Sequence, residues 1–297
     1  MLNRSILRAA VASIPLLATV PTMAQVIPGR AAQREPQTGD EAVAATVAVV
    51  GDAKGDAKGG ATVRIAVTLD IVPGWHVYWE NPGESGAPTE IALELPAGCT
   101  AVQRADGKPA IAFPVPTVFT HGETVFGYEK TVTLSVAVKL PESLPAGGLP
   151  VKVRTSWLVC KQSCLQGRSE ATVDLAKPVA ADSKAAKALA DSLARLPKPL
   201  PAEWKVAIKG VEADKAVLEI AGPASAAADG ELRFIPNDTP GVLLASGYLA
   251  DAKGRVISVP LALSRESALG KPLEAAGLLV VGKNGPAYSF RVAVPAP

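Results

Sequence analysis

The most concentrated chemistry in this 297-residue sequence is a pair of cysteines, Cys160 and Cys164, separated by the polar residues Lys161-Gln162-Ser163. On one straight strand, residues four apart would lie roughly 13 Å apart, whereas a disulfide needs Cα atoms about 4.4–6.8 Å apart. If the cysteines pair, the chain therefore bends between them, with Cys160 ending one strand and Cys164 beginning the next. The sequence predicts a small disulfide at the tip of a hairpin.

A disulfide of this kind has two interpretations. Crosslinking a short loop adds little stability, which favours a bond that opens in thiol–disulfide exchange; the alternative is a structural staple. In exchange, an incoming thiolate attacks the bond and the released thiolate resolves the mixed disulfide. Cys160 follows the apolar residues Trp157-Leu158-Val159, so we expect Cys160 to be the enclosed, resolving cysteine and Cys164 the partner-facing one. Lys161 would lower a thiol pKa by its charge, or is a solvated turn residue.

The remaining cysteine and the two histidines offer competing chemistry. Cys99 closes an apolar strand pattern and is interpreted as a free buried cysteine acting as a small hydrophobe. A Cu(I) or zinc site would use Cys160, Cys164 and either His76 or His121, but two thiolates are too few for a closed zinc site unless both histidines converge. His76 lies in an aromatic strand pattern and is interpreted as a packed or surface residue, so His121 is the better candidate ligand. We expect no cofactor.

The amino terminus has the pattern of a secretory signal. Arg4 and Arg8 precede an apolar stretch over Ala9–Val20, and Thr22-Met23-Ala24 is a small-residue cleavage pattern. The apolar stretch is short of the roughly 20 residues that span a membrane. The sequence therefore predicts export to the periplasm with cleavage near Ala24, in an oxidising compartment where disulfides persist. The rest of the chain is close to neutral, which argues against binding nucleic acid or anionic membranes.

Short alternating runs separated by Gly and Pro turns indicate an all-β protein built on a β-sandwich. Strands are expected, among others, over Thr89–Leu95 and Glu170–Leu175, and helical spacing over Ala181–Leu196 ends at Pro197. Four segments follow the signal peptide of residues 1–24: a flexible leader over 25–40, a first β-sandwich over 41–178, a linker helix and proline linker over 179–201, and a second β-sandwich-like domain over 202–297. The last segment contains neither cysteine nor histidine.

Three motifs in order carry a resemblance to a known family. They are Tyr78-Trp79-Glu80-Asn81-Pro82-Gly83-Glu84-Ser85-Gly86-Ala87-Pro88-Thr89, the segment Gly122–Glu129, and Trp157-Leu158-Val159-Cys160-Lys161-Gln162-Ser163-Cys164. With these motifs, residues 40–178 resemble the amino-terminal periplasmic domain of the DsbD/ScsB thiol–disulfide reductases, and residues 200–295 resemble more loosely a second β subdomain of the ScsB branch.

The resemblance implies a fold, a site and partners. The fold is an immunoglobulin-like sandwich, and the redox pair is assigned to Cys160 and Cys164, with the second cysteine carrying the intermolecular bond. A cap loop with an aromatic residue shields the pair in this family, and Phe119 is the matching candidate. The implied activity is that of a thiol–disulfide oxidoreductase that passes electrons from a thioredoxin-like protein or domain to periplasmic disulfide partners. Full-length members also hold a membrane-embedded electron carrier, which we expect here to be a separate polypeptide. A non-catalytic adaptor with a structural disulfide is the alternative.

Overall fold

The computed structural model describes residues 34–51, 56–104, 106–120, 122–225, 230–264, 266–268, 270–283 and 285–296. The predicted signal peptide and its cleavage site near Ala24 lie outside these residues, as does most of the predicted leader.

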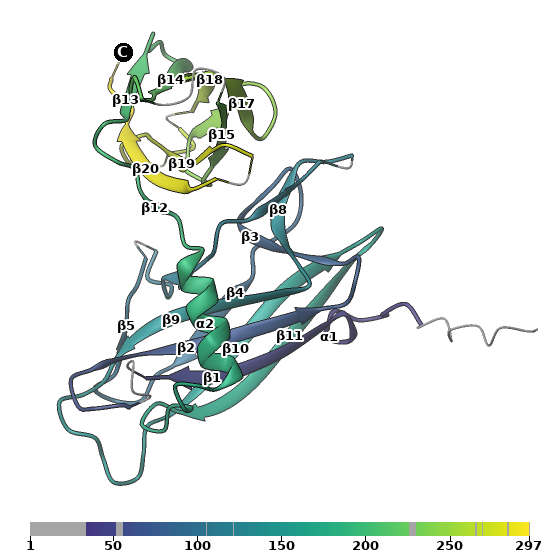
Figure 1. Cartoon of the computed structure of the whole chain (residues 1–297), viewed down its shortest axis with the longest axis vertical. Helices are drawn as coiled ribbons and strands as arrows, with labels where there is room; N and C mark the ends of the chain where they lie inside the picture. Colours follow the sequence, from purple (N-terminus) through teal and green to yellow (C-terminus); the bar gives the residue numbers. More distant parts are fainter. Residues whose placement is uncertain are drawn as a thin grey trace, which may run out of the picture. The chain divides into compact units, whose positions relative to one another are not determined.

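The first β region consists of two sheets that share one apolar core (Figure 1). One sheet has the strand order β1-β2-β9-β5, with β6 also pairing with β9, and the other has the order β11-β10-β3-β8-β7, with β4 also pairing with β10. The first sheet comprises β1 (Val43–Val50), β2 (Thr62–Ile71), β5 (Thr100–Ala101), β6 (Ile111–Ala112) and β9 (Thr131–Lys139). The second comprises β3 (His76–Gly83), β4 (Glu90–Glu94), β7 (Thr117–Phe119), β8 (Val125–Glu129), β10 (Pro150–Cys160) and β11 (Cys164–Asp174).

Alternating side chains explain why these segments form a sandwich. In β3, Val77 and Trp79 are buried in the shared core. The residues that alternate with them, His76 and Tyr78, therefore point to the opposite, outer face of the sheet. In β4, Ile91 is buried and Leu93 packs against the same core. The all-β, immunoglobulin-like class predicted from the sequence is confirmed by this arrangement.

Two helices pack against the first β region. Helix α1 (Gly39–Ala42) begins at the N-cap Thr38, and Trp157 Nε1 donates a hydrogen bond of 3.2 Å to Gly39 O. Helix α1 therefore begins two residues before the predicted boundary at residue 41. Helix α2 (Lys184–Ala194) packs on β9, β1 and β2; its buried Ser192 donates a hydrogen bond to Thr133 O. The segment predicted as a linker helix thus also covers a sheet face.

The second β region has its own core, built from residues such as Leu218, Phe234 and Leu261. Its sheets have the strand orders β12-β20-β19-β15-β17 and β13-β14-β18-β16. The strands are β12 (Lys198–Pro199), β13 (Lys205–Lys209), β14 (Lys215–Ala221), β15 (Glu231–Pro236), β16 (Val242–Leu244), β17 (Ala250–Lys253), β18 (Val256–Leu263), β19 (Glu274–Val281) and β20 (Ala287–Ala293).

One strand that bears on the site is longer than the sequence predicted. The expected strand covered Glu170–Leu175, whereas β11 begins at Cys164 and pairs with β10 along its whole length. The start at Cys164 agrees with the hairpin expected at the cysteine pair, whereas the alternating pattern indicated a strand only from Glu170. In the structure, a Cβ atom at position 167 would overlap the Trp157 indole, so the glycine allows close approach within a strand.

Candidate active site

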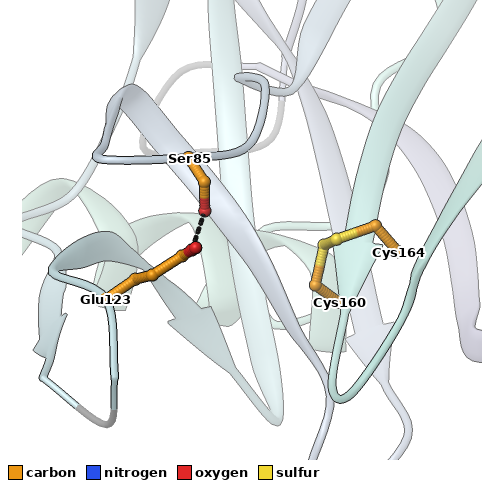
Figure 2. The surroundings of a disulfide bond; sticks show 4 residues. All are labelled: Ser85, Glu123, Cys160 and Cys164. Carbon is orange, nitrogen blue, oxygen red and sulfur yellow. Dashed lines mark hydrogen bonds between the residues drawn. A yellow bond between two sulfur atoms is a disulfide. The ribbon is translucent and has the colours of Figure 1, made fainter.

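A disulfide joins Cys160 and Cys164 at the tip of the hairpin formed by β10 and β11 (Figure 2). Their Cα atoms are 4.2 Å apart. Lys161 N donates a hydrogen bond of 3.1 Å to Ser163 O within the turn. The bend that the cysteine spacing requires is therefore present, and the predicted hairpin-tip disulfide is confirmed.

The two cysteines have different surroundings. Cys160 is 4% exposed, whereas Cys164 is exposed. Cys160 forms a small cluster with Tyr78 and Val125, against which Phe119 and Leu158 also pack. One sulfur-bearing residue is thus enclosed and the other faces solvent, the asymmetry that the sequence predicted from the apolar residues before Cys160.

A row of chemically active residues crosses the sheet at the disulfide. Cys160 lies directly opposite Cys164 on one side and opposite His76 on the other, and His76 lies opposite Glu129. Directly opposed residues on neighbouring strands point to the same face. The outer face therefore carries a disulfide, an imidazole and a carboxylate side by side, in the order Cys164, Cys160, His76, Glu129.

The imidazole of His76 lies between two aromatic rings. It stacks on Phe119 with ring centroids 5.1 Å apart, and it meets Tyr78 edge-on, also at 5.1 Å. Its Nε2 atom is buried and makes no hydrogen bond to any described residue. Burial lowers the pKa of His76, and the negative charge of Glu129 acts in the opposite direction. The neutral imidazole therefore predominates at pH 7.

We use the name aromatic cover for Tyr78 and Phe119, the two rings beside Cys160. Burial raises the pKa of Tyr78, whose hydroxyl is hydrogen-bonded to Ser85. Gly86 has a φ of +104°, and a Cβ atom there would overlap the Tyr78 ring, so only glycine fits where this loop crosses the tyrosine.

Two loops that flank the disulfide are tied together. Ser85 donates a hydrogen bond to the Glu123 carboxylate (Figure 2). Next to it, Thr124 N donates to Glu84 Oε2 at 3.1 Å, and Glu84 N donates to Thr124 O at 2.9 Å. The loop after β3 therefore holds Glu123 and Thr124, which lead directly into β8, the strand whose Val125 pairs with Phe119.

A groove of about 790 Å³ runs along the outer face beside the hairpin tip. Leu158 lies two residues before Cys160 and pairs with Gln166, which lies two residues after Cys164. Both line the groove, together with Pro88 and Arg168. The lining of the groove comes within two residues of each cysteine along the strands but includes neither of them.

The other sequence candidates do not join this row. Cys99 is free and buried, and its burial raises its thiol pKa, as expected of a bystander. Within the described ranges there is no group of three or more His, Cys, Asp and Glu side chains that would hold a metal, and the candidate ligand His121 lies outside those ranges. From the sequence, His76 was considered only as a metal ligand or a packed or surface strand residue, and Glu129 was not singled out, because their approach to Cys160 depends on strand register.

Together these features define an immunoglobulin-like β-sandwich domain with an asymmetric disulfide under an aromatic cover. The family model for the N-terminal domain of the thiol:disulfide interchange protein DsbD matches residues 44–176, and this segment is a DsbD/ScsB-type N-terminal domain. No curated protein sequence matches the chain.

One solved structure supports the fold. The N-terminal periplasmic domain of ScsB from Proteus mirabilis superposes with a TM-score of 0.59 at 19% identity, covering 86% of this chain and 93% of that one. The YadV chaperone and a protein of unknown function from Porphyromonas gingivalis W83 reach TM-scores of only 0.20 and 0.21, each at 11% identity, with 85% of this chain and 99% of theirs covered. Scores this low say nothing about the fold.

Proposed function

We propose that this protein is a periplasmic thiol–disulfide exchange module that relays electrons through Cys160 and Cys164. The observation that carries the proposal is the asymmetry of the disulfide, in which Cys164 is exposed and Cys160 is enclosed. A two-cysteine exchange centre needs one sulfur that meets the partner and one behind it that resolves the intermediate. The match of residues 44–176 to a thiol:disulfide interchange family supports the same chemistry.

In the proposed reaction, a thiolate of a dithiol partner attacks Cys164 Sγ. The sulfur–sulfur bond breaks, and its electron pair leaves on Cys160 as a thiolate. The second thiolate of the partner then attacks the partner's own sulfur in the mixed disulfide and releases Cys164. Two electrons and two protons pass from the partner to the module, and the reverse sequence reduces the disulfide of a downstream partner.

The proposed partners follow from the family. The donor is a thioredoxin-like protein or domain that is reduced in turn by a membrane-embedded electron carrier, and the acceptors are periplasmic proteins with disulfides. The periplasmic location of the ScsB domain supports the same location here. Across the part of the chain that the structure describes, no helix has the length and apolar character needed to cross a bilayer. Phe119 would serve as the cap residue, since it packs against the cluster that encloses Cys160.

A trapping experiment with single-cysteine variants tests the proposal. We expect reduced Cys160→Ser, incubated with an oxidised thioredoxin-like protein, to accumulate a covalent complex on non-reducing gels, because the module retains no second thiol to release the partner. Cys164→Ser should accumulate much less, since Cys160 is enclosed. The matched control is Cys99→Ser, which keeps the pair and should trap nothing.

The reduction potential separates exchange from a structural staple. Structural disulfides of secreted proteins have potentials below about −300 mV, so we expect the Cys160–Cys164 pair to titrate at a higher potential. A more negative value, together with no complex from either serine variant, would establish the adaptor with a structural disulfide. Trapping by Cys164→Ser alone would exchange the roles of the two cysteines.

A further inference from the structure

We infer that His76 is the general base that deprotonates the Cys160 thiol when Cys160 attacks the mixed disulfide, and that Glu129 positions and polarises the imidazole. This inference rests on the proposed exchange function and adds to it the group that moves the proton.

The geometry places the imidazole next to the sulfur that must ionise. His76 and Cys160 are directly opposed on antiparallel strands, so their Cβ atoms lie about 4.5–5.5 Å apart on one face of the sheet. Phe119 and Tyr78 contact the imidazole and also belong to the cluster around Cys160. The imidazole and the enclosed sulfur therefore share one desolvated site.

The Nε2 atom of His76 has an unused hydrogen-bonding capacity in this site. It is buried without a hydrogen bond to any described residue, a situation that ordinarily costs free energy. In the disulfide state Cys160 carries no proton to share. Reduction creates a thiol on the residue directly opposite His76, and we infer that this thiol is the partner that Nε2 lacks in the disulfide state.

The other titratable groups around the site are poorer bases. The Tyr78 hydroxyl is hydrogen-bonded to Ser85, and burial raises its pKa, so it stays protonated near pH 7. Lys161, whose side chain extends over Gly74, is a cation. Glu129 is exposed and separated from Cys160 by His76 in the row. Its charge favours the imidazolium, which is the form that His76 takes once it has accepted the proton.

The resolving step oxidises the module and reduces the partner. In the reduced module, Cys164 has already attacked a partner disulfide, so that Cys164 is bonded to the partner and one partner thiolate has left. Neutral His76 takes the proton of the Cys160 thiol, and the Cys160 thiolate attacks Cys164 Sγ. The bond between Cys164 and the partner breaks, and the second partner sulfur leaves as a thiolate. The imidazolium then returns its proton to solvent or to that thiolate. The module ends as the disulfide, and the partner ends as the dithiol.

The test separates the two half-reactions with the disulfide reagent 5,5′-dithiobis(2-nitrobenzoate), mixed with reduced protein in a Cys99→Ala background. The first release of thionitrobenzoate reports attack by Cys164, and the second reports resolution by Cys160. We expect His76→Gln to leave the first phase within about twofold of the parent. An unassisted thiol with a pKa near 8.5 is only about 3% ionised at pH 7, so we expect the second phase of the variant to slow by roughly tenfold.

The pH profile distinguishes a base from a merely structural residue. In the parent, the second phase should rise with pH and level off below the ordinary imidazole pKa of about 6.5; in His76→Gln the rise should move toward about 8.5, and the two rates should converge above it. Glu129→Gln, at an exposed position, should move the midpoint of the parent profile to lower pH. The control Tyr248→Phe, at an exposed position of the second β region, should keep the profile of the parent.

Each contrary result has a separate meaning. A second phase in His76→Gln with the rate and pH profile of the parent would overturn the role of His76. An unchanged midpoint in Glu129→Gln would overturn the role of Glu129. If the parent itself showed no second release, the proposed exchange function would fail, and the role of His76 with it.

Discussion

The two halves of the hairpin β10–β11 show how one pair of strands serves two purposes. In the half that is remote from the cysteines, the outer face carries exposed ion pairs, in which Arg154 and Lys152 both contact Glu94 and Glu170. In the half that ends at the cysteines, the outer face carries the disulfide beneath the aromatic cover. The register between the strands is continuous through both halves.

The difference between the halves comes from their neighbours. Beside the ion pairs, β10 pairs with β4, and at the tip it pairs with β3, which brings His76 and then β8 and β7. The cover is therefore supplied by segments about 40 to 80 residues away in the sequence. Strand pairing builds a rigid platform in both halves, and the covering side chains decide which half can enclose a reactive sulfur.

The largest effect that we expect in stability is from opening the disulfide itself. For a closed loop of about five residues, the chain-entropy model gives roughly 2 kcal/mol. Reduction should therefore lower the free energy of unfolding of the protein by about that amount and leave it folded, as measured by urea unfolding with and without dithiothreitol. The control is the double variant Cys160→Ser/Cys164→Ser, whose stability should not respond to the reductant.

A loss above about 4 kcal/mol on reduction would contradict this expectation. It would mean that the tip depends on the crosslink as much as small secreted domains depend on theirs, and the disulfide would then be a structural part of the hairpin and not the bond that we propose to open.

The next largest effect that we expect is on the accessibility of Cys160 when the aromatic cover is reduced. In a Cys164→Ser background, we expect Phe119→Ala to speed the labelling of Cys160 by iodoacetamide about tenfold. Phe119 packs against the cluster around Cys160 and stacks on His76, and the loss of an aromatic contact worth about 1 kcal/mol, with the area it covers, corresponds to a change of this size. Mass spectrometry of the labelled peptide gives the rate.

Tyr248→Ala is the matched control, because Tyr248 is an aromatic residue of the second β region that is 43% exposed. It should leave the labelling rate unchanged. Equal rates in Phe119→Ala and in its parent would show that the strands alone enclose Cys160 and that the cover does not distinguish the two halves.

The strands and the hairpin could be predicted from the sequence, whereas the row formed by Cys164, Cys160, His76 and Glu129 could not. Alternation in segments such as Thr89–Leu95 and the polar turn after Cys160 are local properties, so they indicated the strands and the hairpin-tip disulfide. The row from Cys164 to Glu129 depends on a register among four strands that no spacing encodes. One signal was present, since His76 and Tyr78 alternate with Trp75, Val77 and Trp79, which places the histidine on the face opposite the core. Phe119 was accessible only through the family resemblance.

The smallest effect is expected at the remote end of the same hairpin. There Asp174 Oδ1 accepts hydrogen bonds from Leu149 N at 2.7 Å and Ala176 N at 3.0 Å. These backbone donors, with the bond from Leu149 foremost, hold the pKa of Asp174 below its ordinary value. We expect Asp174→Asn to lower the free energy of unfolding at pH 7 by less than about 1 kcal/mol, as is usual for a partly exposed group.

The pH dependence of that loss distinguishes the two ends. A carboxylate whose pKa is lowered by folding stabilises the protein above its unfolded pKa of about 3.9, and this contribution disappears as the pH falls through the lower folded value. The difference in the free energy of unfolding between the parent and Asp174→Asn, measured by urea unfolding, should therefore shrink only below about pH 4. At the cysteine end, burial lowers the pKa of His76, so the parent should lose stability already as the pH falls below about 6.5, and His76→Gln should not. If both variants altered the same pH range, the two ends of the hairpin would be electrostatically coupled, and the disulfide site could not be treated as separate from the strands that carry it.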